Sequence, residues 1–109
     1  MDAITFGSTY EENVYRALAQ RKVDFEYQVP FFGGRAVRGG QVVDFLVYGL
    51  GRKPIALFVD GPYWHKGRKT LEDQLKRTQL ERAGYQVLVI GAESETFEQT
   101  LQWLMENLK

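Results

Sequence analysis

Two apolar runs lie close together in QVVDFLVYGLGRKPIALFVDGP, residues 41–62. The run at 41–48 is rich in β-branched and aromatic residues, which favour strands. The run at 55–60 is apolar almost throughout, as expected of a strand that is mostly buried. A glycine-containing turn at 49–54 separates the two runs, and Gly61-Pro62 ends the second. The segment therefore predicts two strands that pair as an antiparallel hairpin.

The flanking sequence predicts helices and two more strands. Ser8 and Glu11 have the spacing of a capping box, so we expect a helix over 9–21. A strand over 25–29 should end at Pro30, and the glycine-rich segment 31–40 should form a mobile loop or a hairpin tip. Beyond residue 62, we expect a helix over 70–83 closed by Gly84, a strand over 85–90 and a helix over 96–108.

This order of elements predicts the fold class. The helix between the third and fourth strands indicates a parallel crossover, because parallel neighbours need a long connection. We therefore expect an α/β sandwich with a central four-stranded mixed sheet flanked by helices, in the order αβββαβα. The 109 residues fit a single domain, residues 1–109.

Composition excludes several classes of protein. The chain has no cysteine and a single histidine, which excludes disulfides, thiolate zinc sites, iron–sulfur clusters and multi-histidine metal sites. No apolar run approaches the roughly 20 residues of a membrane span. The N-terminus lacks the apolar core of a signal peptide. We therefore expect a cytoplasmic protein with no membrane partner.

The charge distribution is uneven, although the formal net charge is zero. Residues 27–71 carry seven Lys and Arg against only Asp44 and Asp60, a net charge of +5, whereas both ends of the chain are acidic. A basic surface favours a polyanionic partner such as DNA. Ordinary solvated charge explains the same pattern, so the charge alone leaves both interpretations open.

Two aspartates interrupt or end the apolar strands. Asp44 lies inside the first run and Asp60 ends the second. Partly buried aspartates are rare unless they are paired, hydrogen-bonded or bound to a metal, and two carboxylates on neighbouring strands suit Mg²⁺. The alternatives are a solvent-facing Asp44 at a strand edge and an Asp60 that starts the turn at Gly61-Pro62.

Two further residues are candidates for the chemistry. His65 follows the second run in GPYWHKG, residues 61–67, where a loop beyond a buried strand suits a general acid or base. A lone histidine is more commonly an ordinary surface or core residue. Glu11 shares a helix face with Val14 and Leu18 and should point inward, although the capping box is a sufficient structural role for it.

Several of these motifs occur together, in a recognisable order. They are Ser8-x-x-Glu11, Val43-Asp44-Phe45, Phe58-Val59-Asp60-Gly61-Pro62-Tyr63-Trp64-His65, Asp73, Leu80 and Gly84-Tyr85-x-Val87-Leu88. This pattern, over roughly residues 8–93, resembles the very-short-patch-repair (Vsr) endonucleases and their small relatives. These proteins belong to the PD-(D/E)xK, or restriction-endonuclease-like, superfamily.

The resemblance implies a restriction-endonuclease-like sandwich and metal-dependent cleavage of DNA phosphodiester bonds, with Mg²⁺ or Mn²⁺ as cofactor. By position, Asp44 matches the central metal-binding aspartate and Val59 offers its backbone carbonyl to the metal. His65 matches the histidine that handles the water or the phosphate, and Glu11 matches the acidic residue of the first helix.

The chain also departs from the family pattern. Phe58 and Asp60 stand where the Glu-x-Lys half-motif is usual, and Asp60 replaces a second histidine of the Vsr enzymes. The structural zinc of those enzymes cannot be built without cysteine. The extended apparatus that recognises mismatches has no room, so mismatch specificity is not carried over.

The favoured hypothesis is a small Mg²⁺-dependent DNA endonuclease or nickase. Asp44 and Asp60 would hold the cation while His65 assists proton transfer, and a homodimeric junction resolvase is a variant of this hypothesis. Residues expected to contact DNA are Arg35, Arg38, Tyr63, Trp64, Lys66, Arg68 and Lys69, although Tyr63-Trp64 also suits an aromatic core pair. The alternative is a degenerate nuclease fold that serves as a DNA-binding or protein-interaction module.

Overall fold

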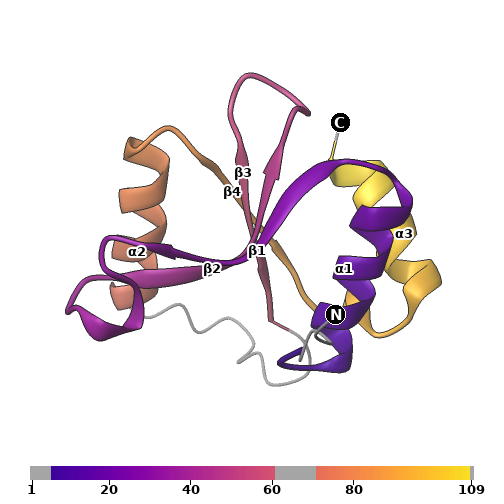
Figure 1. Ribbon diagram of the computed structural model, residues 1–109, viewed down its shortest axis with the longest axis horizontal. Helices are drawn as coiled ribbons and strands as arrows, with labels where there is room; N and C mark the ends of the chain where they lie inside the picture. The colour runs from indigo at the N-terminus through magenta and orange to yellow at the C-terminus, as the bar shows by residue number, and fades with distance from the viewer. Residues whose placement is uncertain (1–5, 61–70, 109) are drawn as a thin grey trace, which may run out of the picture.

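The expected order of helices and strands is confirmed by the computed structural model in Figure 1, which describes residues 6–60 and 71–108. The elements of the described residues are α1 (Thr9–Gln20), β1 (Asp24–Phe31), the 3₁₀ turn η1 (Gly34–Ala36), β2 (Gln41–Tyr48), β3 (Ile55–Val59), α2 (Leu71–Arg82), β4 (Gln86–Ile90), the 3₁₀ turn η3 (Ala92–Ser94) and α3 (Phe97–Asn107). None of the helices in this part of the chain is long and apolar enough to cross a bilayer.

Within the described residues, the strands form one mixed sheet in the order β1-β2-β3-β4. The β1–β2 and β2–β3 pairs are antiparallel and β3–β4 is parallel, so the predicted hairpins and the crossover through α2 are confirmed. β1 pairs with β2 along its length, from Asp24 opposite Tyr48 to Phe31 opposite Gln41. The β2–β3 pairing reaches only from Val47 to Phe45, and beyond it the two strands diverge (Figure 1).

One difference from the sequence prediction concerns the end of β1. The strand was expected to end before Pro30, yet it continues to Phe31. β1 is an edge strand, so its outward-facing N–H groups have no partner in the sheet. A proline, which lacks an N–H, is therefore tolerated there. The hairpin tip predicted between β1 and β2 is confirmed and contains η1.

The larger core lies between the sheet and the pair α1 and α3, which pack side by side (Figure 1). Val14 and Leu18 of α1 and Leu104 of α3 are fully buried against this part of the sheet. Burying one such side chain contributes about 1.5–3 kcal/mol. The strands contribute to this core Phe45, Val47, Ile55, Leu57 and Ile90.

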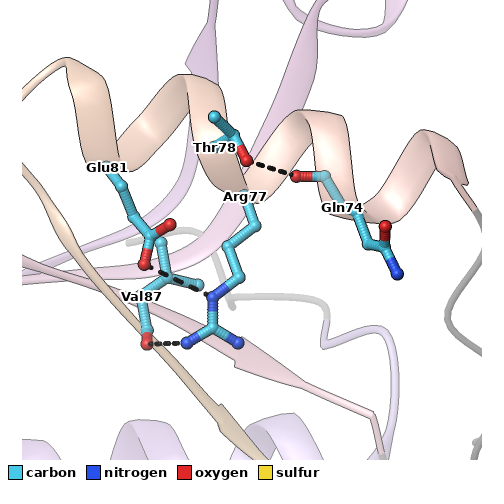
Figure 2. A network of polar contacts seen from close by, with 5 residues as sticks. All are labelled: Gln74, Arg77, Thr78, Glu81 and Val87. Carbon is cyan, nitrogen blue, oxygen red and sulfur yellow. Dashed lines mark hydrogen bonds and ion pairs between the residues drawn. The ribbon is translucent and has the colours of Figure 1, made fainter.

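The opposite side of the sheet carries α2 on a smaller core. Leu80 is the buried residue of α2 and packs with Val43, Ala56 and Val87. Figure 2 shows how Arg77 ties the helix to the sheet: its Nη2 donates to the carbonyl of Val87 at 3.4 Å, and its Nε pairs with Glu81 at 3.5 Å. Among the described residues of α2 only Leu80 is buried, and side-chain hydrogen bonds of Arg77 and Gln41 also join the helix to the sheet.

The helix ends follow from local side chains. Ser8 caps α1 by accepting from the N–H of Glu11 at 3.2 Å, and Thr96 caps α3 by accepting from the N–H of Gln99 at 3.1 Å. Gly84 follows α2 with a φ of 101°, a left-handed conformation that glycine adopts without steric cost. These caps place Glu11 in the first turn of α1, facing β1.

Candidate active site

Asp44 lies where β2 and β3 separate. Its Oδ2 accepts a hydrogen bond from the backbone N–H of Val59 at 2.9 Å. The β2–β3 pairing ends at Phe45 and Leu57, so β2 offers the N–H of Val59 no main-chain acceptor. The Asp44 carboxylate accepts this hydrogen bond instead. Asp44 is half-buried and lies on an inner strand, so it is not an aspartate at a sheet edge.

Glu11 reaches β1 with its carboxylate. The Oε1 atom accepts from the hydroxyl of Tyr27 at 2.7 Å and from Nε2 of Gln28 at 3.1 Å. Gly7 leaves room for this arrangement, because a Cβ there would lie 2.5 Å from Oε2 of Glu11. The prediction that Glu11 points inward is confirmed, and the carboxylate has partners outside the capping box.

Gln28 joins the two acidic residues, a role that the sequence did not predict. Its Nε2 donates to Glu11 and also lies 3.4 Å from Oδ1 of Asp44. Its Oε1 accepts from Nη2 of Arg35 at 3.3 Å. A glutamine in a strand carries no signal of such a role, because nothing in the local sequence indicates which carboxylates the fold brings to it.

The electrostatic surroundings of Asp44 are unfavourable to its negative charge. Burial, the largest cause, and the charges of Glu11 and Asp60 together raise the pKa of its carboxyl from 3.8 to about 6. The hydrogen bond from Val59 and the positive charge of Arg35 act in the opposite direction on this pKa. The negative charges around Asp44 are therefore only partly compensated, and a cation bound beside Asp44 would be attracted to them.

Asp60 and Val59 lie at the same end of β3. Asp60 is half-buried, directly follows the strand, and is close enough to Asp44 for its charge to affect that pKa. The N–H of Asp60 donates to the carbonyl of Ile90 at 2.9 Å, whereas the N–H of Val59 points to Asp44. Because the N–H and C=O of one strand residue point to the same neighbour, we expect the Val59 carbonyl to point toward Asp44 as well.

These oxygen atoms suit a hard cation. Among residues 6–60 and 71–108, no group of three or more Asp, Glu or His residues is close enough to hold a metal ion. Mg²⁺ keeps several waters and binds through as few as one or two carboxylates. A cation held by Asp44, Asp60 and the Val59 carbonyl would therefore keep most of its waters and would not sit in a closed cage of protein ligands.

Arg35 lies near Asp44 and bonds Gln28, and Arg38 lies on the same hairpin tip. Both are exposed and line a groove of about 510 Å³ between that tip and the start of α2. Glu72, Asp73 and Lys76 of α2 also line the groove. The two arginines are thus available to a polyanion, whereas the wall provided by α2 is mixed in charge.

The remaining predicted residues lie outside the described part of the chain. They are Tyr63, Trp64, His65, Lys66, Arg68 and Lys69, within residues 61–70. Phe58 is described: it is half-buried and packs against the core beneath α2. Phe58 therefore has a packing role in the smaller core.

No protein-family model matches this chain, and no curated protein or solved structure matches it significantly.

Proposed function

We propose that the protein is a metal-dependent DNA endonuclease or nickase with a restriction-endonuclease-like fold. The observation that carries the proposal is Asp44, a half-buried carboxylate at the point where β2 and β3 separate. A bound cation would offset the nearby negative charges of Glu11 and Asp60, which contribute to the raised pKa of Asp44. The mixed sheet and the order αβββαβα agree with the fold that the sequence resemblance implies.

Each candidate residue has its own role in the proposed reaction. Asp44 and Asp60 would hold Mg²⁺ or Mn²⁺, with the backbone carbonyl of Val59 as a third oxygen ligand. When bound, such a cation polarises the scissile phosphate and lowers the pKa of water. His65, five residues after Asp60, accepts the proton of the attacking water.

DNA binding depends on the basic middle of the chain. Arg35 and Arg38 contact backbone phosphates from the hairpin tip, and such contacts position the duplex without reading its sequence. Lys66, Arg68 and Lys69 add positive charge in the segment that follows Asp60, where Tyr63 and Trp64 stack on bases. A cytoplasmic location, in which DNA and Mg²⁺ are both present, belongs to the same proposal.

Nicking of supercoiled plasmid tests the proposal directly. The wild-type protein is incubated with plasmid in Mg²⁺, in Mn²⁺ and in EDTA, alongside Asp44→Asn and the control Asp24→Asn. Asp24 is exposed at the start of β1, so the control makes the same chemical change away from the site. We expect metal-dependent nicking that Asp44→Asn abolishes and Asp24→Asn retains, and equal nicking by both variants would refute the proposal.

One observation favours a second candidate, a DNA-binding or interaction module on a degenerate nuclease fold. Phe58 packs into the core where an acidic metal ligand is expected, which removes half of the usual motif. In that case the protein would bind DNA with equal affinity in EDTA and in Mg²⁺, and it would not cut in either. The same plasmid assay, read for mobility shift as well as for nicking, separates the two candidates.

A further inference from the structure

Gln28 has a backbone conformation that is unusual inside a strand. Its φ is 57°, in the left-handed region, although its neighbours pair regularly with β2, Tyr27 opposite Phe45 and Val29 opposite Val43. The other non-glycine residues of the described chain with positive φ are Lys22 and Phe32, which lie outside the strands. A strained residue within a regular ladder persists only where its surroundings hold it.

The left-handed backbone places the Gln28 side chain where an ordinary strand would not. Successive side chains of a strand point to opposite faces of the sheet. Tyr27 and Gln28 are successive, yet the hydroxyl of one and Nε2 of the other both donate to Oε1 of Glu11, at 2.7 and 3.1 Å. The break in alternation therefore brings the amide to the carboxylate.

The hydrogen-bond partners of the Gln28 amide show which end is the nitrogen and which is the oxygen. Glu11 and Asp44 can only accept when ionised, so the atom between them is the nitrogen, Nε2. Arg35 can only donate, so the atom that it contacts is the oxygen, Oε1. The side chain is thus fixed from both sides, with its donors between two carboxylates that repel each other.

We infer that Gln28 is the positioning residue of the acidic site: its strained backbone holds the amide between Glu11 and Asp44 and thereby fixes the Asp44 carboxylate for the cation. The inference rests on the proposed function, which assigns no role to Gln28. Without the amide, the repulsion between Glu11 and Asp44 is uncompensated, and Oδ1 of Asp44 loses its contact with β1. Arg35 extends this arrangement to the hairpin tip, where we place the DNA phosphates.

The test measures Mn²⁺ affinity of the full chain by electron paramagnetic resonance, which needs no activity. Gln28→Leu removes the amide, and Gln28→Asn keeps an amide that tolerates the left-handed region but is one methylene too short to reach both carboxylates. We expect both variants to weaken Mn²⁺ binding on the order of 10- to 100-fold, the usual effect of a residue that orients a metal ligand. At saturating Mn²⁺ we expect the KM for DNA to stay near the wild-type value and kcat to fall.

Lys22→Gly and Gln28→Gly form a matched pair, because both residues have a φ of 57°. Glycine relieves the strain at either position, but only Gln28→Gly also removes the amide from the site. We expect Lys22→Gly to leave Mn²⁺ affinity unchanged and Gln28→Gly to weaken it as Gln28→Leu does, with melting followed by circular dichroism to show that the variants are folded.

The outcomes separate this inference from the proposed function. Folded Gln28 variants with wild-type Mn²⁺ affinity and kcat, beside an Asp44→Asn that has lost both, would overturn the role of Gln28 and leave the nuclease proposal standing. A wild-type protein that binds no Mn²⁺, or an Asp44→Asn that binds it equally well, would overturn both.

Discussion

The backbone N–H of Val59 donates to Oδ2 of Asp44 at 2.9 Å, across the gap that opens where β2 and β3 part. This bond gives Asp44 a structural role in addition to its proposed role toward a cation. An asparagine can keep the bond, because its side-chain oxygen also accepts. The charge of Asp44 and its hydrogen bond can therefore be separated by experiment.

Asp44→Asn should change the pH dependence of stability in the metal-free protein. The pKa of Asp44 is about 6 in the folded state and 3.8 as its ordinary value, so the folded state holds the proton more tightly. Its contribution to stability is complete below about pH 4 and is lost as the pH rises through 6, by an amount on the order of 3 kcal/mol at most.

The variant has no carboxyl to ionise, so its free energy of unfolding should lack this decrease. Urea denaturation at several values between pH 4 and 7 measures the difference, with Asp24→Asn as control. Parallel profiles for wild type and Asp44→Asn would mean that Asp44 is solvated much as in the unfolded chain. A greater stability of Asp44→Asn at pH 7 without metal is the expected result.

Tyr27→Phe should destabilise the fold more than Tyr48→Phe. Each substitution removes a hydroxyl that donates to a glutamate, Glu11 in the first case and Glu26 in the second. The Tyr27 bond is part-buried and the Tyr48 bond is exposed, so only the first loses a bond that water cannot readily replace. We expect a loss of about 1–2 kcal/mol for Tyr27→Phe and under about 0.5 kcal/mol for Tyr48→Phe. Equal losses, measured by urea denaturation, would show that Glu11 is as well hydrated as Glu26.

The sequence predicted the fold well because its signals were local. Capping residues, strand composition and Gly84 all act over a few residues, and they placed the helices and strands close to their observed bounds. The inward direction of Glu11 also followed from helical spacing. These features need no knowledge of which strand lies next to which.

The rest of the site depends on contacts between distant residues. The packed sheet determines where β2 separates from β3 and gives Gln28 its left-handed φ. Neither Gln28 nor Val59 signals these features in the sequence. Asp44 was singled out by its apolar neighbours, but its bond to Val59 was not foreseen. The sequence therefore indicated the acidic residues and missed the amide that joins two of them.

Leu80→Ala and Leu75→Ala should differ strongly, although both residues lie on α2. Leu80 is fully buried beneath the helix, whereas Leu75 is 58% exposed. Truncating a buried leucine costs about 2–5 kcal/mol, whereas surface substitutions usually stay within about 0.5 kcal/mol. Thermal denaturation would show a large fall in Tm for Leu80→Ala only. A comparable fall for Leu75→Ala would indicate that its exposed side is covered in solution.

Arg38→Gln and Arg52→Gln test whether the hairpin tip contacts DNA phosphates. Arg38 lines the groove beside the acidic site, whereas Arg52 lies in the β2–β3 turn, and both are exposed. Each lost phosphate contact lowers the slope of log affinity against log salt concentration by about 1. We therefore expect Arg38→Gln to weaken DNA binding and reduce this slope by about 1, with Arg52→Gln close to wild type. Fluorescence anisotropy between 50 and 200 mM salt, a range of about fourfold, provides the measurement. A larger effect at Arg52 than at Arg38 would place the DNA at the other end of the sheet, away from Asp44.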